Sequence, residues 1–454
     1  MASNSATCGT VSRRGFVAGG LGLGPLIVPR RVLGGAGFQA PSNKITIGFI
    51  GTGEHGVGTN IGGFLKPVNS VDAQLVAVCD VDSDHLEQAK ARIEKGYAAE
   101  SASGTFKGVA TYRDFRELIA RKDIDAVCIS TPDHWHIIPA IMAARAGKDV
   151  FTEKPLTLTI EEGRTICDVI RRTKRVFQTG SEQRARPQFH QMCELIRNGR
   201  IGKLKHIDVG LPGGHSINKP TWDPRPAMEF CEPPKNLDYD FWLGQAPKTS
   251  YFPGRCHWNF RWILDYSGGQ FTDYAHHLID IAQWAHGTED TLPIEVEGTG
   301  TFPKEGLYNT ATAFKCNYLF ADGVTMTVNS SGASHRFEGS DGWIVNQGFG
   351  TLSASNPEIL KSEIGPNEIH LYRPVSEHRD FLDCVRSRKK CYAHEGVGHR
   401  AVAFAHMGNV AMLLGRKLKF DPKTDRFADS DANKMPMSSR PQREPWTLAR
   451  ALKS

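Results

Sequence analysis

The stretch Lys44–Gly56, KITIGFIGTGEHG, decides the fold of the first half of this chain. Its β-branched run up to Ile50 predicts a buried strand, which leads directly into the pattern G-x-G-x-x-G. A helical segment follows from about Val57 to Leu65, and Ala73–Cys79 (AQLVAVC) predicts a second strand. Strand, glycine turn, helix and strand in this order are the context that marks a dinucleotide-binding unit.

Each glycine of this pattern has a physical role. Gly51 allows the tight turn, Gly53 allows a pyrophosphate to approach the backbone, and Gly56 allows the helix to pack close to the strand. The helix N-terminus then offers free N–H groups and the positive end of its dipole to the phosphates. Asp80, directly after the second strand, is expected to accept hydrogen bonds from the ribose hydroxyls, which favours NAD over NADP.

The alternation of strands and helices continues beyond this unit. The predicted strand Ala126–Ser130 is followed by the loop Thr131–His136, and the strand Asp149–Thr152 is followed by Glu153–Pro155. In a doubly wound parallel sheet, ligands bind beyond the carboxyl ends of the strands. We therefore expect this loop, Lys154 and the glycine turn to face one site.

The second half of the chain has a different pattern. Several β-rich runs come together, and helices return at Glu377–Ser387 and Arg400–Leu414. Such grouping predicts an α+β domain with a large open, mostly antiparallel sheet. It follows an N-terminal Rossmann domain, which is predicted to be of the α/β class with a doubly wound parallel sheet. The predicted divisions are a signal peptide at 1–36, a NAD-binding domain at 43–180, a substrate and oligomerisation domain at 181–421 and a C-terminal arm at 422–454.

One helical pattern in the second half carries ionisable groups. The segment Ser267–Trp284, SGGQFTDYAHHLIDIAQW, opens with two glycines and places Asp273 and His277 four residues apart. Asp280 follows three residues later, so the spacing predicts one helix face that carries two carboxylates and an imidazole. That face is able to donate and accept protons.

The N-terminus carries a targeting signal. Ser12–Phe16 contains the pair Arg13 and Arg14 and precedes the apolar, glycine-rich run Val17–Val28, as in a twin-arginine signal peptide. This run is too short to cross a bilayer, which takes about 20 residues, so no transmembrane span is expected once the signal is removed. We expect export by the twin-arginine route, with a periplasmic location.

Composition excludes other classes of function. The first 36 residues hold four arginines and no acid, and without them the formal net charge falls from +6 to +2. The remaining charges are mixed along the chain, which gives nucleic-acid binding no support. The ten cysteines are dispersed and form no C-x-x-C pair, which argues against a disulfide framework or a zinc knuckle.

The motifs together resemble those of the glucose–fructose oxidoreductase and inositol dehydrogenase family, Gfo/Idh/MocA. The resembling segments are GFIGTGEHG, CDVD, STPDHWH, FTEKP and GGQFTDYAHHLID, which lie within about residues 44–420. The resemblance implies a Rossmann domain and an α/β domain whose open sheet mediates dimers or tetramers. The chain is similar above all to exported members that carry a twin-arginine leader.

The resemblance also implies a catalytic set. In the family, the lysine of E-K-P and the aspartate and histidine of D-x-G-x-H correspond to Lys154, Asp273 and His277, and Ala275 stands where glycine is usual. Histidine titrates near neutral pH, so His277 suits the base that takes a hydroxyl proton while hydride leaves for the nicotinamide. Lys154 is expected to stabilise negative charge on the reacting oxygen, and Asp273 to bind the substrate hydroxyl.

Two larger sets complete the predicted site. The predicted cofactor-binding residues are Gly51, Gly53, Glu54, His55, Gly56, Asp80, Thr131, Pro132, His136, Glu153 and Lys154. The predicted substrate-binding residues are Gln183, Arg184, Arg261, Trp262 and Asp265. A metal site can be imagined from His134, His136, His276 and Asp273, but no established ligand spacing supports it, so no metal is predicted.

The expected function is NAD-dependent oxidation of a hydroxyl of a sugar or polyol, with a tightly bound cofactor that is recycled in place. An exported enzyme has no soluble NAD pool to draw on, so net oxidation requires a second sugar as acceptor. The alternative is redox-neutral glycoside cleavage by transient oxidation, elimination, hydration and re-reduction, with Tyr266 or Tyr274 as an extra base. A third possibility is a non-catalytic sugar-binding protein, which the intact lysine, aspartate and histidine set disfavours.

Overall fold

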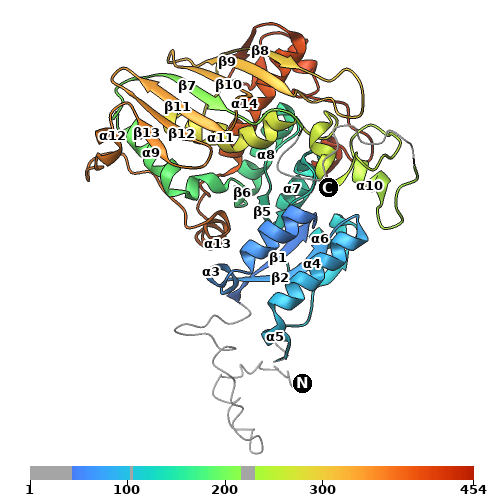
Figure 1. Ribbon diagram of the computed structural model, residues 1–454. Coiled ribbons are helices and arrows are strands. Elements are labelled where there is room, and N and C mark those ends of the chain that lie inside the picture. Colours follow the sequence, from blue (N-terminus) through green and yellow to red (C-terminus); the bar gives the residue numbers. More distant parts are fainter. Residues whose placement is uncertain (1–42, 103–105, 216–230, 454) are drawn as a thin grey trace, which may run out of the picture. The chain divides into compact units, whose positions relative to one another are not determined.

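The computed structural model describes residues 43–102, 106–215 and 231–453, and the predicted signal peptide lies outside these ranges. The chain from Ile45 onward forms one compact unit built on two β-sheets (Figure 1). Among the described residues, none of the helices combines the length and the apolar composition that a membrane crossing needs.

The first sheet has six parallel strands in the order β3-β2-β1-β4-β5-β6. Its strands are β1 (Ile45–Ile50), β2 (Ala73–Cys79), β3 (Ala110–Tyr112), β4 (Ala126–Ile129), β5 (Asp149–Thr152) and β6 (Phe177–Thr179). This order reverses between β1 and β4, as in doubly wound dinucleotide-binding sheets. The predicted Rossmann fold is therefore confirmed.

Helices cover both faces of this sheet, because alternate strand residues point to opposite sides. Ile47 and Phe49 pack with one group of helices, whereas Ile50 packs with the other. The first group comprises η2 (Gly56–Ile61), α2 (Gly62–Phe64), α3 (Pro67–Ser70), α4 (Ser83–Gly96) and α13 (Glu377–Ser387), whereas the short α5 (Ala98–Ala102) has no buried residues. The second group comprises α6 (Phe115–Ala120), α7 (Ile137–Arg145), α8 (Ile160–Thr173) and the terminal α15 (Leu448–Ala451).

The second sheet has nine strands in the order β13-β12-β11-β7-β10-β9-β8-β14-β15. Its strands are β7 (Leu204–Gly210), β8 (Glu295–Thr301), β9 (Ala313–Leu319), β10 (Thr325–Asn329), β11 (Ser334–Gly339), β12 (Trp343–Gln347), β13 (Leu352–Ala354), β14 (Leu418–Asp421) and β15 (Arg426–Phe427). Strands β7 and β10 pair in parallel, and the other described neighbours pair antiparallel. The predicted mostly antiparallel sheet is confirmed.

The helices α9 (Pro187–Arg197), α11 (Gln270–His286) and α14 (Glu395–Leu414) pack with this sheet in the largest hydrophobic core of the described structure. Helix α11 is buried along nearly its whole length. It begins after Gly269, whose φ of +75° suits glycine, and it ends at Gly287 in the left-handed region. These two glycines fix the helix that carries Asp273 and His277.

Six short elements lie between the longer ones in the described residues. They are η3 (Asp133–Trp135), η4 (Glu182–Ala185), α10 (Tyr239–Leu243), η5 (His257–Trp262), α12 (Glu358–Lys361) and η6 (Ala432–Lys434). The end of the chain lies against the Rossmann helices, where the ring of Trp446 stacks on Phe241 with centroids 4.7 Å apart. Segments far apart in the sequence, α13 and α15, thus complete the packing of the first sheet.

Candidate active site

A cavity of about 430 Å³ lies where the carboxyl ends of the Rossmann strands face the start of α11. It brings together most of the residues that the sequence singles out. The predicted residues that line it are Gly51, Gly53, Glu54, His55, Asp80, Thr131, Pro132, Glu153, Lys154, Arg261, Asp273 and His277.

The glycine turn has the geometry that a dinucleotide needs. A Cβ on Gly51, whose φ is +81°, would lie 2.6 Å from the backbone nitrogen of Thr131, and a Cβ on Gly56 would lie 2.6 Å from the carbonyl oxygen of Gly51. A Cβ on Gly53, by contrast, meets nothing closer than the His85 ring at 3.7 Å. Gly51 and Gly56 are therefore required by the fold itself, whereas Gly53 leaves open space at the cavity wall.

Asp80 holds this turn in place. Its Oδ2 accepts hydrogen bonds from the backbone nitrogen of Thr52 at 2.6 Å and from the Thr52 hydroxyl at 3.1 Å. Its Oδ1 accepts from the backbone nitrogen of Asp82 at 2.9 Å. The carboxylate is thus fixed at the cavity wall, and its contact with a ribose stays a prediction.

Lys154 and Asp273 meet across the cavity. Lys154 Nζ donates to Asp273 Oδ1 at 2.8 Å, and Arg261 Nε approaches the same oxygen at 3.4 Å. Burial alone would raise the pKa of Asp273, but Lys154 and Arg261 outweigh burial and hold that pKa well below its usual range. Burial alone would lower the pKa of Lys154, and the Asp273 carboxylate raises it above its ordinary value. The pair is therefore ionised, with a cationic amine at the site.

His277 lies one helical turn after Asp273 and lines the same cavity. Burial, followed by the nearby charge of Lys154, lowers the pKa of His277 well below its ordinary value. Its Nδ1 is buried without a hydrogen-bond partner among the described residues. The imidazole is therefore neutral, which is the protonation state that a general base requires.

Glu153 ties the glycine-turn helix to the end of β5. Its Oε1 accepts from Asn60 Nδ2 at 2.8 Å and lies 3.1 Å from His55 Nε2, while its Oε2 accepts from the backbone nitrogen of Lys154 at 3.1 Å. Burial would raise the pKa of Glu153, but His55 and these donors hold it well below its usual range. The same carboxylate raises the pKa of His55. This network positions the backbone on which Lys154 stands.

Asp133 is a site residue that sequence reasoning missed. It is 3% exposed, lines the cavity and accepts a hydrogen bond from the Ser267 hydroxyl at 2.6 Å. Burial raises the pKa of Asp133 to about 7. The signal was available, since Asp133 lies in the loop Thr131–His136 at the carboxyl end of a strand. A carboxyl that titrates near neutral pH is suited to exchanging protons with a ligand.

Aromatic side chains form one wall of the cavity. Trp242, Trp258 and Tyr274 are among its lining residues. The guanidinium of Arg261 lies over the Trp258 ring, 4.2 Å from its centroid, which places a second cation next to Asp273. This wall has the apolar faces and polar edges that suit stacking against a sugar ring.

Among the described residues, the three histidines considered for a metal belong to no group of potential metal ligands. His134 Nε2 lies 3.0 Å from the carbonyl oxygen of Trp242, and the two ring nitrogens of His136 lie 2.8 and 2.9 Å from those of Pro155 and Thr131. Burial lowers the pKa of all three histidines considered, including His276, whose pKa falls to about 4. His136 therefore joins the two loops beneath the cavity and does not line it.

Arg184 is a correction to the sequence-based prediction, because its guanidinium is already engaged. Its Nε and Nη2 donate to the two oxygens of Asp280 at 2.8 and 2.6 Å, and its Nη1 pairs with Glu289. All of this lies outside the cavity, and the Asp280 side chain is only 2% exposed. Arg184 and Asp280 therefore form a buried ion pair away from the cavity, and Asp280 does not line the cavity as Asp273 does.

Three other predicted substrate-binding residues also lie outside the cavity. Gln183 is buried and donates to Glu182 Oε1 at 3.0 Å. Trp262 is fully buried and stacks on His215 with centroids 5.5 Å apart. The backbone oxygen of Asp265 accepts from Arg440 at 3.0 Å. The structure therefore corrects the set, of which Arg261 alone lines the cavity.

The residues present fit a dinucleotide. Gly53 leaves room beside the backbone, and the Thr131 hydroxyl at the cavity wall is buried without a partner among the described residues. The glycine turn and Asp80 stand at the ends of β1 and β2, where such ligands bind. A buried, unpartnered hydroxyl in a polar cavity is a group that a ligand can satisfy.

Two family models match most of the chain. Residues 45–181 match the model described as "Oxidoreductase family, NAD-binding Rossmann fold", and residues 187–448 match "Oxidoreductase family, C-terminal alpha/beta domain". Both models belong to one family, Gfo/Idh/MocA.

Individual relatives agree in fold. An alpha-N-acetylgalactosaminidase of Shewanella oneidensis is 32% identical over 171 residues, which cover 37% of this chain and 36% of the relative. The match thus spans about a third of that curated relative. A levoglucosan dehydrogenase in complex with NADH and levoglucosan has a TM-score of 0.61 at 17% identity, covering 83% of this chain and 99% of the other. The aldose–aldose oxidoreductase of Caulobacter crescentus, complexed with glycerol, has a TM-score of 0.59 at 17% identity, covering 83% and 100%.

Proposed function

The chain belongs to the Gfo/Idh/MocA family of oxidoreductases, and we propose that it transfers a hydride between NAD and a hydroxyl-bearing carbon of a sugar or polyol. One observation carries this proposal. Lys154 at the end of β5 and Asp273 on α11 form an ion pair in the cavity that the glycine turn also lines. A cation, a neutral imidazole and a dinucleotide-type turn thus share one enclosed space.

The residues around the cavity would hold NAD in the following way. The backbone at Gly53 faces the phosphates, Asp80 faces the ribose and the Thr131 hydroxyl completes the set. When bound, NAD supplies the hydride acceptor. A carboxylate at the ribose hydroxyls disfavours a phosphate there, so we propose NAD over NADP.

The protein's own groups then perform the proton chemistry. His277, neutral in the free enzyme, accepts the hydroxyl proton of the substrate. Lys154 donates a hydrogen bond to the reacting oxygen and stabilises its negative charge. Asp273 keeps Lys154 cationic and orients it, and Arg261 completes the same charge cluster. The aromatic wall of Trp242, Trp258 and Tyr274 holds the sugar face.

A redox-neutral glycosidase is the second candidate. The specific observation that favours it is Asp133 at the cavity wall, where burial raises its pKa to about 7, with the phenol of Tyr274 lining the same cavity. Elimination and hydration each move a further proton, so an additional acid or base would be used. The similarity to an alpha-N-acetylgalactosaminidase, over a match that covers 36% of that relative, supports the same idea.

One experiment separates the candidates. Purified protein is loaded with NAD and mixed with a panel of free sugars and of nitrophenyl glycosides. A persistent rise in the absorbance of reduced nicotinamide indicates net oxidation, whereas release of nitrophenol without a lasting rise indicates the glycosidase. If sugars bind and neither signal appears, the protein is a sugar-binding protein and the proposed enzyme activity is wrong.

We also propose export in the folded state with the cofactor already bound. The support is the pair Arg13 and Arg14 before an apolar run, which lies outside the described residues. Replacing both arginines by lysine should move the protein from the periplasmic to the cytoplasmic fraction of a Gram-negative host. An unchanged periplasmic fraction would refute this route.

A homo-oligomer, either a dimer or a tetramer, is the assembly we propose. Along β9, residues alternate between buried and exposed, so Ala313, Lys315 and Asn317 share an uncovered face of the large sheet. Sedimentation velocity on the purified protein should give the mass of two or four chains, and a monomer at micromolar concentration would contradict the proposal.

A further inference from the structure

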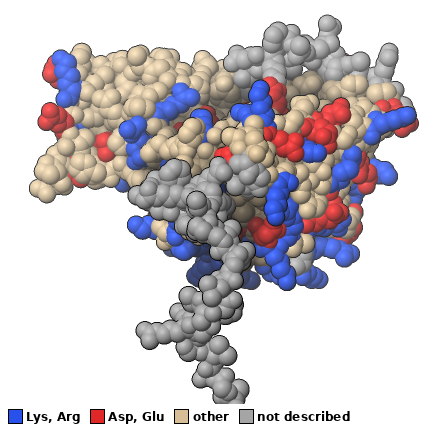
Figure 2. Space-filling model, turned by 90° about the horizontal axis from the view of Figure 1, so that it is seen from below, with Lys and Arg blue, Asp and Glu red and all other residues tan. Residues whose placement is uncertain are grey.

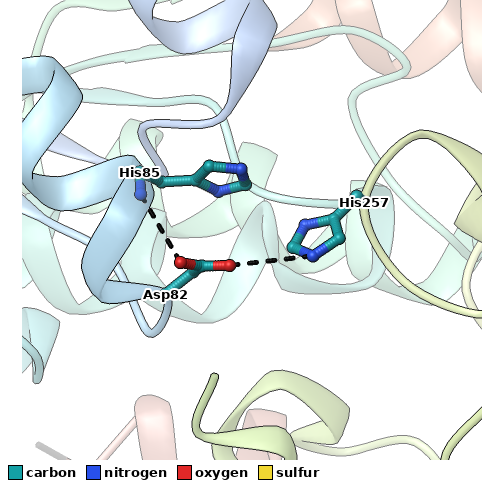
Figure 3. A group of neighbouring side chains, drawn as sticks. All are labelled: Asp82, His85 and His257. Atoms are coloured by element: carbon teal, nitrogen blue, oxygen red, sulfur yellow. Dashed lines mark hydrogen bonds and ion pairs between the residues drawn. The ribbon is translucent and has the colours of Figure 1, made fainter. Parts of the chain in front are cut away.

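Three potential metal ligands gather at the rim of the cavity, and none belongs to the catalytic set. They are Asp82 and His85 at the start of α4 and His257 at the start of η5 (Figure 3). One ligand atom of each lies within 4.8 Å of those of the others. The three side chains come from two segments about 170 residues apart in the sequence, so only the fold brings them together.

The carboxylate of Asp82 is oriented for this role. Its Oδ1 accepts from the backbone nitrogen of Asp84 at 2.9 Å and from Asn236 Nδ2 at 2.9 Å, which fixes the side chain. Its Oδ2 points toward His257 Nε2 at 3.7 Å, a distance too long for a hydrogen bond (Figure 3). One oxygen is thus held by the protein and the other is presented to the two imidazoles, an arrangement typical of ligating carboxylates.

The histidines are neither buried in the core nor satisfied by close partners. The side chain of His85 is 27% exposed and that of His257 is 41% exposed, so an ion can reach both. The closest charged partner of His85 is Asp80 Oδ2, at 4.0 Å from Nδ1.

The backbone of His257 adds an independent observation. Its φ of +55° lies in the left-handed region, which a residue with a side chain occupies at a free-energy cost. This conformation places the ring against His85, with centroids 4.9 Å apart and planes at 74°, and faces it toward Asp82.

We propose that Asp82, His85 and His257 bind one divalent transition-metal ion, with zinc as the best match. Two imidazole nitrogens and one carboxylate oxygen are a common zinc donor set, and water completes the tetrahedron. The ligand atoms lie within 4.8 Å of one another, and ligand atoms around tetrahedral zinc lie about 3.3 Å apart, so the three side chains need to close by about 1.5 Å at most. Rotation of two half-exposed imidazoles provides this movement.

The ion would join two parts of the structure beside the dinucleotide turn. The His85 ring lies 3.7 Å from where a Gly53 Cβ would stand, and its Nδ1 lies 4.0 Å from Asp80 Oδ2. On the opposite wall, η5 also carries Arg261, which contacts Asp273. A bound cation would therefore connect α4 to η5 and add positive charge next to the expected position of the pyrophosphate.

The test uses untagged, metal-stripped full-length protein and Zn²⁺ or Co²⁺ alone, without cofactor. Calorimetry should give one zinc per chain, and Co²⁺ should produce the visible absorption of a tetrahedral site. His85→Ala and His257→Ala should each weaken binding by more than the roughly 10–100-fold that loss of an outer-shell partner costs. His206→Ala is the matched control, because His206 pairs with Asp208 at 3.4 Å on the surface and belongs to no group of three potential ligands among the described residues.

The proposed metal site is wrong if zinc does not bind at micromolar concentration, or if both histidine variants bind zinc as tightly as the wild type. Two variants and a thermal unfolding check on each distinguish loss of the site from loss of the fold. Because the probe is the metal alone, the outcome does not depend on the proposed oxidoreductase activity.

Discussion

Lys154 Nζ lies 2.8 Å from Asp273 Oδ1, although 119 residues separate the two along the chain. The Rossmann sheet supplies the lysine and the second domain's central helix supplies the aspartate. Their ion pair closes one side of the cavity, so the position of the amine depends on both halves of the molecule. Sugar chemistry at this site would therefore require the Rossmann sheet and α11 to keep their relative positions.

Asp273→Asn should abolish most of the activity while leaving the fold intact. The variant keeps the shape of the side chain but removes the charge that raises the pKa of Lys154. Loss of this electrostatic support should lower kcat by about 10²–10⁴-fold. Steady-state kinetics and bound-dinucleotide content measure the effect, and Lys122→Met at an exposed position is the control. Wild-type kcat in Asp273→Asn would contradict the assigned role.

Gly53→Ala should separate cofactor binding from folding. Nothing lies within 3.7 Å of the added methyl group, so the free energy of unfolding should change by less than about 1 kcal/mol. The methyl group would occupy the space where a pyrophosphate approaches, so NAD affinity should fall at least about tenfold. Gly51→Ala, by contrast, should unfold the turn, because its Cβ would lie 2.6 Å from Thr131 N. Fluorescence titration with NADH and thermal unfolding measure the two quantities, and unchanged NADH affinity in Gly53→Ala would refute the placement.

Arg184→Met should destabilise the protein without altering catalysis. The change leaves Asp280 as an uncompensated buried carboxylate, and breaking a buried pair costs about 3–5 kcal/mol. Because Arg184 lies outside the cavity, KM and kcat per folded molecule should stay at wild-type values below the melting temperature. Arg172→Met, at an exposed position on α8, is the matched control. A raised KM with unchanged stability would restore the original assignment of Arg184 to the substrate.

Asp133→Asn should change how stability depends on pH. Burial raises the pKa of Asp133 to about 7 in the folded state, whereas the ordinary value is 3.8. Between these values the folded state holds a proton that the unfolded state has lost, so the wild type loses stability as pH rises from about 4 to 7. We compare the free energy of unfolding of Asp133→Asn with that of the wild type. The difference, variant minus wild type, should therefore be near zero at pH about 4 and rise to a plateau of up to about 4 kcal/mol above pH about 7.

Chemical denaturation across this pH range measures that difference, because the other titrating groups are common to both proteins. Ser267→Ala provides a second comparison, since it removes the hydroxyl that donates to Asp133 at 2.6 Å. A pH-independent difference between Asp133→Asn and wild type would show that Asp133 is ionised throughout.

The features that could be predicted from sequence are those whose cause is local. The glycine turn is recognisable because Gly51, Gly53 and Gly56 stand between a strand and a helix, and their steric roles depend on a few neighbouring residues. Asp273 and His277 could be placed on one cavity wall because helical periodicity relates positions four apart.

The features that escaped prediction depend on partners distant in the sequence. Arg184 looked free because Asp280, its partner, lies 96 residues away. Asp280 shares the helix face of Asp273 and His277, but it lies about two turns further along α11 than Asp273 and does not line the cavity. In the same way, the approach of His257 to Asp82 and His85 has no signature in the sequence, since it arises from how η5 packs beside α4.

The central claim is that Lys154, Asp273 and His277 serve hydride transfer to a bound dinucleotide. The most direct measurement is a single-turnover experiment, in which NAD-loaded protein is mixed rapidly with sugars and the absorbance of reduced nicotinamide is followed. Both mechanisms predict that the absorbance of reduced nicotinamide rises in the wild type. The rise lasts in the dehydrogenase mechanism and is transient in the glycosidase mechanism. In Lys154→Met, the rate of this rise should be reduced at least about a hundredfold. The claim would be contradicted if no dinucleotide binds, or if Lys154→Met forms reduced nicotinamide as fast as the wild type.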